Sequence, residues 1–358
     1  MEFIDILQEA VLTGASDIHI LVGKPPMVRI RGEMLPLKKF PSMTAEESKR
    51  LIYSILYDDQ KQRFEETMEL DCSFAVKDLA RFRVNVLKQR NGVECVLRVI
   101  SSKIPTPESL RLPPAITELI NLPRGLVLVT GPTGSGKSTT LACLIQLINE
   151  KFSDHILTIE DPIEFVYESS NSVIRQREVG QSTHSFQAAL RSALRQDPDV
   201  IMVGEMRDLE TISLAITAAE TGHLCFGTLH TSDAAQTVDR IIDVFPTAQQ
   251  QQVRVQLSSA LRAVVCQTLI PRKEGDERIA AREIMIVTAA ISNLIREGKT
   301  HMIANAIETG AKVGMISLDK ALIDLVKGGF ITLEDACAKA NNPDTVRSGK
   351  VAVSGFTY

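Results

Sequence analysis

Apolar side chains recur at helical spacing in two segments near the start of the chain, 2–12 and 45–64. Intervals of three and four residues place such side chains on one face of an α-helix. Each segment is therefore predicted to be an amphipathic helix. The apolar faces consist of Phe3, Ile6, Leu7 and Ala10 in the first segment and of Leu51, Ile55 and Leu56 in the second.

Strict alternation of apolar and polar residues distinguishes a second kind of segment. In residues 81–87, Phe82, Val84 and Val86 alternate with arginine and asparagine, and residues 93–100 alternate in the same way. Such alternation is typical of a β-strand with one buried face. With a further short strand at 27–30, these segments predict a small α+β domain over residues 1–100.

A proline-rich stretch then interrupts every periodic pattern. Residues 101–117 contain Pro105, Pro107, Pro113 and Pro114. Proline is disfavoured in the interior of both helices and strands. The stretch is therefore interpreted as a linker between the first domain and a second domain over 118–358.

Beyond this linker, short apolar runs alternate with helical patterns. Strands that are apolar throughout and separated by helices imply a parallel sheet covered on both faces. The second domain is thus predicted to be α/β, and from residue 249 onward the chain is expected to be nearly all helical. The predicted strands are 125–130, 155–160, 199–204 and 225–229, the predicted helices are 137–149, 186–195 and 209–221, and Val253, Leu257, Leu261 and Val264 continue at helical spacing.

Composition narrows the class of protein. Lys and Arg number 40 against 44 Asp and Glu, which gives a formal charge of −4, and aromatic residues make up 4% with no Trp. Nucleic-acid-binding proteins usually carry a basic face or stacking aromatics, so no nucleic acid is expected as a partner. No apolar run approaches the ~20 residues that span a bilayer, and the start of the chain lacks the features of a signal peptide. A cytoplasmic protein without direct membrane insertion is expected.

The number and spacing of the cysteines are consistent with a protein in a reducing compartment. No C-x-x-C pair is present, and such pairs are typical of structural zinc sites. The six residues are instead predicted to be mostly buried, unpaired thiols. They are Cys72, Cys95, Cys143, Cys225, Cys266 and Cys337.

Residues 131–138, with the sequence GPTGSGKS, match the Walker A phosphate-binding loop and lie between a predicted strand and a predicted helix, as that loop requires. Its glycines let several N–H groups point at phosphate, next to a helix N-terminus that favours anions. Lys137 would neutralise the β- and γ-phosphates of ATP, and Ser138 would offer a hydroxyl to Mg²⁺. The predicted nucleotide-binding residues are Gly131, Pro132, Thr133, Gly134, Ser135, Gly136, Lys137, Ser138 and Thr139.

A phosphate loop also needs acidic residues for the metal and for the attacking water. Residues 200–205 occupy the Walker B position, with Gly204 where an Asp is common. Glu205 must then act on Mg²⁺ through water or polarise the attacking water. A second acidic segment, 158–164, ends another strand; carboxylates on an ordinary loop are simply solvated, but ligands bind at the carboxyl edge of a parallel sheet. Glu164 is the predicted general base, and the predicted Mg²⁺ residues are Ser138, Glu160, Asp161 and Glu205.

Two histidines, His223 and His230, flank the predicted strand 225–229. A lone histidine beside an apolar strand usually has only a structural role. Two of them near the edge of the nucleotide-binding sheet are interpreted as sensors of the γ-phosphate, and His230 is also a candidate catalytic residue. Neither has a second ligand at metal spacing, so zinc is not expected.

Together these motifs resemble those of the type II/IV secretion ATPase superfamily, and within it the ATPases that retract type IV pili. The Walker A loop is followed in order by an acidic box at 160–164, the sequence GEMRD at 204–208 and a histidine box over 221–231. Signatures typical of the family also occur near both ends, GASDIH at 14–19 and AISNLIRE at 290–297. The resemblance therefore extends over nearly the whole chain.

The resemblance implies a PAS-like first domain, a RecA-like second domain with a helical C-terminal part, and a homohexameric ring. It implies an enzyme that hydrolyses ATP with Mg²⁺ and uses interdomain motion to act on an inner-membrane platform protein at the pilus base, from the cytoplasmic side. Pilin subunits would then return to the membrane and the fibre would shorten, as in twitching motility. It also implies that arginines of the first domain complete the catalytic site, and the candidates are Arg81, Arg83 and Arg98. From composition alone, these arginines would be expected to lie on a solvated face of the strands.

Several alternatives stay open. Extension and secretion members generally carry extra N-terminal domains and a four-cysteine zinc motif, and neither is found in this sequence, which favours retraction over them. Ser292 stands where retraction members usually have Arg, and this difference bears on coupling to the pilus. An accessory retraction ATPase, a RecA-like nucleic-acid motor and a non-hydrolysing ATP-binding regulator are the remaining hypotheses, and the acidic balance disfavours the nucleic-acid motor.

Overall fold

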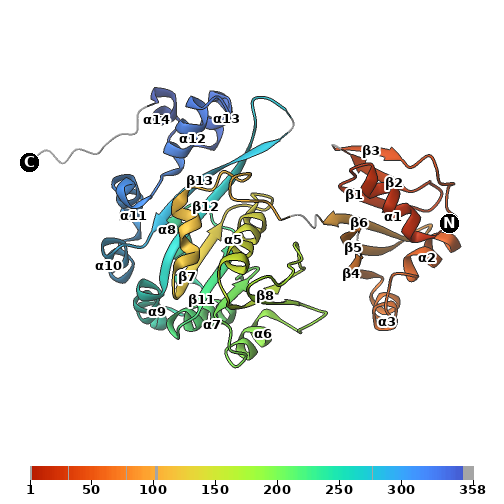
Figure 1. Ribbon diagram of the computed structural model, residues 1–358, viewed down its shortest axis with the longest axis horizontal. Helices are drawn as coiled ribbons and strands as arrows, with labels where there is room; N and C mark the ends of the chain where they lie inside the picture. The colour runs from red at the N-terminus through yellow and green to blue at the C-terminus, as the bar shows by residue number, and fades with distance from the viewer. Residues whose placement is uncertain (1, 31, 78, 101–103, 276, 350–358) are drawn as a thin grey trace, which may run out of the picture. The chain divides into compact units, whose positions relative to one another are not determined.

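Two compact units make up the chain in the computed structural model, which describes residues 2–30, 32–77, 79–100, 104–275 and 277–349 (Figure 1). The first unit is Met1–Lys103 together with the short segment Glu164–Val166, and the second is Ile104–Ile163 and Tyr167–Tyr358. The predicted linker 101–117 falls in part on residues 101–103, which lie outside the described residues. Each unit has its own apolar core.

An antiparallel six-stranded sheet forms the first unit, with the strand order β3-β2-β1-β6-β5-β4. One face of this sheet packs with α1 in a core that includes Ile6, Ile18, Phe82 and Leu97. The alternation predicted for 81–87 is confirmed, because Phe82, Val84 and Val86 are fully buried. The elements are α1 Phe3–Leu12, β1 Asp17–Ile20, β2 Met27–Ile30, β3 Glu33–Pro36, α2 Ala45–Tyr53, α3 Asp58–Thr67, β4 Glu69–Val76, β5 Ala80–Gln89 and β6 Gly92–Ile100.

The single helix predicted over 45–64 is two helices, α2 and α3. The Ser54 hydroxyl donates a hydrogen bond of 2.6 Å back to the carbonyl oxygen of Leu51 at the end of α2. The backbone N–H of Tyr57 then donates to Oε1 of Gln60 at 3.0 Å and so begins α3. Local side-chain bonds of this kind compete with a continuous helix.

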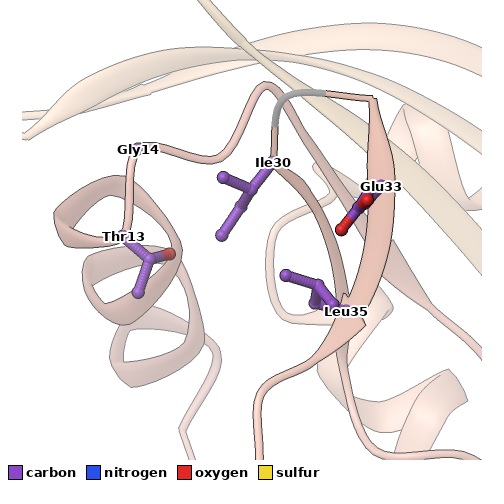
Figure 2. A pocket seen from close by; sticks show the side chains of 5 residues that line it. All are labelled: Thr13, Gly14, Ile30, Glu33 and Leu35. Carbon is purple, nitrogen blue, oxygen red and sulfur yellow. The ribbon is translucent and has the colours of Figure 1, made fainter.

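A cavity of about 610 Å³ opens in the first unit near the end of α1, as Figure 2 shows. It is lined by the apolar side chains of Ile30 and Leu35 and by Thr13, Gly14 and Glu33. None of these five described residues is basic.

The second unit is built on a seven-stranded sheet with the order β13-β12-β7-β11-β10-β8-β9. Its strands from β12 to β9 pair in parallel, and β13 is antiparallel to β12. All residues of β7 and β11 are buried, as expected for a sheet covered on both faces. The strands are β7 Gly125–Thr130, β8 His155–Glu160, β9 Val173–Glu178, β10 Val200–Val203, β11 Leu224–Leu229, β12 Leu261–Pro271 and β13 Arg278–Ile286.

Helices cover this sheet and also form the end of the chain. The helices α12, α13 and α14 lie together and contact the far end of the β12–β13 hairpin, where Ile270 and Ile279 pack against Leu322 (Figure 1). The predicted fold class is confirmed: a small α+β part precedes an α/β part with a parallel-rich sheet and a helical end. The helices are α4 Pro114–Thr117, α5 Lys137–Lys151, α6 Phe186–Ala193, α7 Leu209–Glu220, α8 Ala234–Asp243, α9 Thr247–Ala260, α10 Ala289–Glu297, α11 Ile303–Thr309, α12 Leu318–Lys327, α13 Leu333–Lys339 and α14 Pro343–Ser348, with short 3₁₀ turns at η1 Glu118–Asn121, η2 Thr300–Met302 and η3 Ala311–Val313.

A second part of the predicted secondary structure also differs from the structure. The chain from residue 249 onward was expected to be nearly all helical, but helix α9 ends at Ala260 and two long strands follow, β12 and β13. Leu261 and Val264 belong to β12, where both are buried. A strand buried on both faces is apolar at successive positions, so its residues also match a helical stripe, and periodicity alone does not distinguish the two.

Four of the six cysteines are buried, and each of the six is a thiol and not part of a disulfide. Burial raises the pKa of the Cys225 thiol to about 12 and that of Cys143 to about 11. The prediction of buried thiols is confirmed for Cys95, Cys143, Cys225 and Cys266, whereas Cys72 and Cys337 are half-buried.

No helix within the described residues is both long enough and apolar enough to cross a bilayer.

A buried carboxylate joins two helices of the second unit. Oε1 of Glu283, on β13, accepts a hydrogen bond of 2.8 Å from the backbone N–H of Ala234, the first residue of α8. The backbone of Leu318, the first residue of α12, also bonds to this carboxylate. Burial raises the pKa of Glu283 to about 7, with Asp233 and Asp319 adding to the effect and the two backbone groups opposing it.

We predict that Glu283→Gln removes part of the pH dependence of stability. Because the pKa of Glu283 lies near 7 in the folded chain and at its ordinary 4.5 when unfolded, the folded state binds more protons between these values, and the wild-type free energy of unfolding falls as the pH rises through this window. Glutamine has no proton to lose. Urea unfolding of both proteins from pH 4.5 to 8 measures the difference, which should grow across the window in favour of the variant. A difference that is constant with pH contradicts the assignment.

Candidate phosphate-binding site

The predicted phosphate loop lies between the end of β7 at Thr130 and the start of α5 at Lys137. Gly131 has φ +141°, and a Cβ atom there would lie 2.2 Å from the carbonyl oxygen of Gln267 on β12. Gly136 has φ +85° and precedes the first turn of α5. Only glycine adopts these backbone conformations at so close an approach without strain. The path of this loop therefore requires glycine at these two positions.

Polar groups of the loop are arranged to receive an anion. The Ser135 hydroxyl is buried and has no hydrogen-bond partner among the described residues. The Lys137 ammonium donates to the carbonyl oxygens of Gly131 at 2.8 Å and Pro132 at 3.1 Å, so it lies over the loop. The first turn of the 15-residue helix α5 adds free N–H groups and the positive end of its dipole. An unsatisfied hydroxyl beside a cation and a helix N-terminus fits a phosphate group.

The parallel register of the sheet brings three further predicted residues to the same edge as this loop. Leu229 of β11 pairs with Thr130 of β7, and Val203 of β10 pairs with Ile159 of β8. Residues that follow these strands therefore lie along one carboxyl edge. They include Glu160 at the end of β8, Glu205 after β10 and His230 after β11.

Glu205 is held by two neighbours at this edge. Its Oε1 accepts from Nε of Arg207 at 2.5 Å and lies 3.1 Å from Nε2 of His230, while Oε2 accepts from Nη2 of Arg207 at 2.7 Å. Partial burial raises the pKa of Glu205, but the hydrogen bonds and charge of Arg207, together with His230 and Lys137, outweigh this effect and lower it. Glu205 is thus kept ionised. Arg207 was not assigned a role from the sequence, although it belongs to the GEMRD signature at 204–208.

The glycine in the Walker B position has a steric reason. A Cβ atom at Gly204 would lie 3.2 Å from the carbonyl oxygen of Ile159 and 3.3 Å from Cα of Glu160. The N–H of Gly204 also donates to the carbonyl oxygen of Ile159 at 2.8 Å. A side chain at this position would require the backbones of β8 and β10 to move apart by a few tenths of an ångström.

Two polar residues of β9, the half-buried Gln176 and the buried Glu178, hold the acidic segment. Glu160 is buried, and its Oε1 accepts from the hydroxyl of Thr158 at 2.7 Å and from Nε2 of Gln176 at 3.1 Å. Oε1 of Gln176 accepts from the N–H of Tyr167, and Glu178 accepts from the N–H of Ile163, both at 3.0 Å. The loop is therefore fixed before and after Glu164. Sequence reasoning missed Gln176 and Glu178.

The three carboxylates of this segment differ in exposure. Glu160 is buried at the end of β8, whereas Asp161 and Glu164 are exposed. Asp161 and Glu164 are therefore open to water, while Glu160 faces the interior of the sheet edge and is held there by Gln176. The position that suits a general base is thus Glu164, and it stays a prediction.

The structure separates the two histidines. His230 lies beside Glu205, but His223 precedes β11 and therefore lies at the opposite edge of the sheet. There, Nδ1 of His223 is 2.9 Å from the carbonyl oxygen of Ala218, and its carbonyl oxygen accepts from the N–H of Gly125. A strand of six residues spans roughly 20 Å. The expectation that both histidines lie near the phosphate edge of one chain is corrected: only His230 does.

The candidate arginines share the polar face of the sheet in the first unit. Arg83 on β5 pairs directly with Arg98 on β6, and Arg98 pairs with Asp17 on β1. Nε of Arg98 donates to Asp17 Oδ1 at 3.0 Å, and Arg81 donates to the hydroxyl of Ser73 at 2.6 Å. The side chain of Arg83 is exposed and forms no hydrogen bond or ion pair with another described residue. The three therefore form one cluster, of which Arg83 is the most available.

Magnesium chemistry fits the donors at the sheet edge. The ion prefers oxygen ligands and usually takes only one or two carboxylates, with waters and substrate phosphates completing its shell. Ser138, half-buried in the first turn of α5, supplies a hydroxyl, and Glu205 is ionised. No group of three or more His, Cys, Asp and Glu suited to a metal is found in the described part of the chain. The donors thus suit an ion that is bound together with nucleotide.

Comparison with known proteins identifies the family. The family model described as "Type II/IV secretion system protein" matches residues 2–312. The chain belongs to this family. The match confirms the resemblance to this family that the order of the sequence motifs indicates.

Two relatives and one solved structure cover nearly the whole chain. The type IV pilus retraction ATPase PilT of Pseudomonas aeruginosa is 52% identical over 96% of this chain and 99% of its own length. The type IV pilus ATPase PilU of the same organism is 40% identical over 97% of this chain and 91% of its own length. A crystal structure of the pilus retraction motor PilT with bound ADP has a TM-score of 0.92 at 47% identity, and covers 97% of this chain and 99% of that one. The chain is an ATPase of this family.

We predict that Arg207→Gln raises the pKa of Glu205. The variant keeps a polar side chain but removes the charge and the paired hydrogen bonds that lower this pKa. NMR titration of the side-chain carboxyl carbons of ¹³C-labelled glutamates measures this pKa, and the Glu205→Gln variant identifies the signal of Glu205. An unchanged Glu205 titration in the variant would show that Arg207 does not control the charge of this carboxylate.

Proposed function

We propose that this chain is an ATP-hydrolysing motor that drives the retraction of type IV pili. The observation that carries the proposal is the identity of 52% with a pilus retraction ATPase over 96% of this chain and 99% of that protein. Similarity over the full length of both proteins includes the parts outside the phosphate loop, on which coupling to a pilus depends. The described site supplies the chemistry that such a motor needs.

The phosphate loop binds the triphosphate of ATP. The N–H groups of the loop and of the first turn of α5 donate to phosphate oxygens, while Lys137 leaves the carbonyl oxygens of Gly131 and Pro132 to neutralise the β- and γ-phosphates. Ser138 and Glu205 would hold Mg²⁺, Glu205 partly through water, and Glu160 and Asp161 are the further proposed metal-side residues. The ion would supply positive charge that compensates the negative charge of the phosphates.

Glu164 is the proposed general base, which accepts a proton from the attacking water. It is exposed, on a loop fixed by Gln176 and Glu178. The direct contact of His230 with Glu205 supports its proposed role as a sensor of the γ-phosphate. Arg83 is proposed to compensate the charge of the transition state, because Arg81 and Arg98 already have partners in the first unit.

The motor is proposed to act as a homohexameric ring at the cytoplasmic face of the inner membrane. Its partner there is the platform protein at the pilus base, and the pilin fibre is moved indirectly. These partners rest on the family resemblance. A PAS-like domain over 1–100, a linker over 101–117 and a RecA-like domain over 118–358 are the proposed moving parts.

An accessory role in retraction is the second candidate. PilU is 40% identical to this chain over 347 residues, whereas PilT is 52% identical over 344 residues. The higher identity favours the role of the principal retraction ATPase. The two roles differ in what the cell loses when this chain is absent.

We predict that Glu164→Gln binds ATP but scarcely hydrolyses it. The amide keeps the shape of the side chain and loses the basic oxygen, so turnover should fall by on the order of a hundredfold or more. Steady-state phosphate release and equilibrium binding of a fluorescent ATP analogue measure the two properties. Glu168→Gln, an exposed glutamate on the same segment, is the matched control and should behave as wild type.

Lys137→Ala completes this test, because it should lose binding as well as turnover. Wild-type turnover in Glu164→Gln contradicts the assignment of the base and would move it to Glu205. A non-hydrolysing regulator, in contrast, would release no phosphate even as wild type.

Deletion of this chain in its own host tests the function itself. If it drives retraction, the cells should keep pili that no longer shorten, and wild-type protein but not Glu164→Gln should restore shortening. Fluorescent labelling of pili and time-lapse microscopy measure this. Loss of pili on deletion indicates extension, and pili that still shorten with reduced force indicate the accessory role.

A further inference from the structure

A buried amide lies directly beneath the phosphate loop. Gln267 belongs to β12, the strand that pairs with β7, and only 3% of it is exposed. Its Nε2 donates a hydrogen bond of 2.7 Å to the carbonyl oxygen of Ser135, and its Oε1 accepts from the hydroxyl of Thr140 at 3.0 Å. Both ends of the amide are therefore used, one on the loop and one on helix α5.

The orientation of this amide is determined by its partners. The carbonyl oxygen of Ser135 can only accept a hydrogen bond, so the NH₂ end of Gln267 must face it. The oxygen end then faces Thr140, whose hydroxyl donates to it. An isosteric carboxylate would place an acceptor against the Ser135 carbonyl, so only an amide meets both demands.

Holding the Ser135 carbonyl also orients the next N–H group. The peptide unit is planar and trans, so its C=O and N–H bonds point in opposite directions. With the oxygen of Ser135 directed at Gln267, the N–H of Gly136 points away from β12 and toward the open side of the loop. In phosphate loops this side receives the nucleotide phosphates.

The backbone of Gln267 adds a second contact to the loop. Its carbonyl oxygen lies so close to Gly131 that no Cβ fits there, and its Nε2 would lie 3.2 Å from a Cβ at Gly136. The two glycines at the ends of the loop thus both pack on this one residue of β12.

We propose that Gln267 is a positioning residue for nucleotide binding, which holds the Ser135–Gly136 peptide so that its N–H is aimed at the phosphates. Gln267 itself does not touch the nucleotide. The inference rests on the proposed function only in that this loop binds ATP, and it is independent of what the motor moves.

Gln267→Met tests the proposal. Methionine has a similar volume but no amide, so the loop keeps its packing and loses both hydrogen bonds. We expect the Kd for ADP, measured by calorimetry, to rise on the order of tenfold, which corresponds to one lost, well-aligned hydrogen bond to the ligand. Because the Gly136 N–H binds phosphate before and during reaction, KM for ATP should rise more than kcat falls.

Val265→Ala is the matched control. Val265 is fully buried on the same strand and its truncation lowers stability by leaving a cavity, but it has no hydrogen bond to the loop. A merely structural role for Gln267 predicts that both variants lose nucleotide affinity in proportion to their loss in Tm. The positioning role predicts that only Gln267→Met loses affinity.

Thr140→Val gives an independent reading, also where Gln267→Met fails to fold. It removes the donor that orients the amide, so we expect weaker ADP binding, by a smaller factor than for Gln267→Met, and no further loss when the two are combined. If folded Gln267→Met binds ADP as tightly as wild type, the inference is overturned but the proposed function is not. If Gln267→Met does not fold, wild-type ADP affinity in Thr140→Val has the same meaning. Wild-type protein that binds no ADP overturns the proposed function, and the inference with it.

Discussion

The candidate site depends on one constraint, the parallel register of β8, β10, β11 and β7. Pairing in parallel places the carboxyl ends of these strands along one edge. Segments far apart in the chain then meet there: the phosphate loop, Glu205, Glu160 and His230. Because all residues of β7 and β11 are buried, a shift in this pairing would expose the core as well as dismantle the site. Fold stability and site geometry are therefore linked.

Buried and half-buried polar side chains of the sheet hold the loops at its edge in place. Gln267 holds the phosphate loop, Gln176 holds Glu160, and Glu178 holds the N–H of Ile163. Each lies on a strand next to the loop that it holds. A buried polar group left without a partner is costly, so these bonds restrict the loops to few conformations. The site thus has a supporting layer in the sheet beneath it.

The sequence predicted the elements that carry the chemistry and missed this supporting layer. The strands 125–130 and 155–160 coincide with β7 and β8, because short apolar runs between loop motifs have few other interpretations. Gln267 was missed because it lies in a segment with helical spacing that folds as β12, and its partners Ser135 and Thr140 are 132 and 127 residues away along the chain. His223 lies away from the phosphate loop because the whole length of β11 separates it from His230. Long-range pairing reveals the role of Gln267, and the length of β11 separates the two histidines.

The location of bound metal tests the account most directly. Mn²⁺ replaces Mg²⁺ at such sites and scatters X-rays anomalously, so crystals grown with Mn²⁺ and a non-hydrolysable ATP analogue would reveal it. We predict one anomalous peak at the carboxyl edge of the sheet. The ion at this peak should be bonded to the hydroxyl of Ser138 and to phosphate oxygens, with the carboxylate of Glu205 in direct or water-mediated contact. A peak remote from Ser138, with nucleotide bound away from residues 131–138, would contradict it.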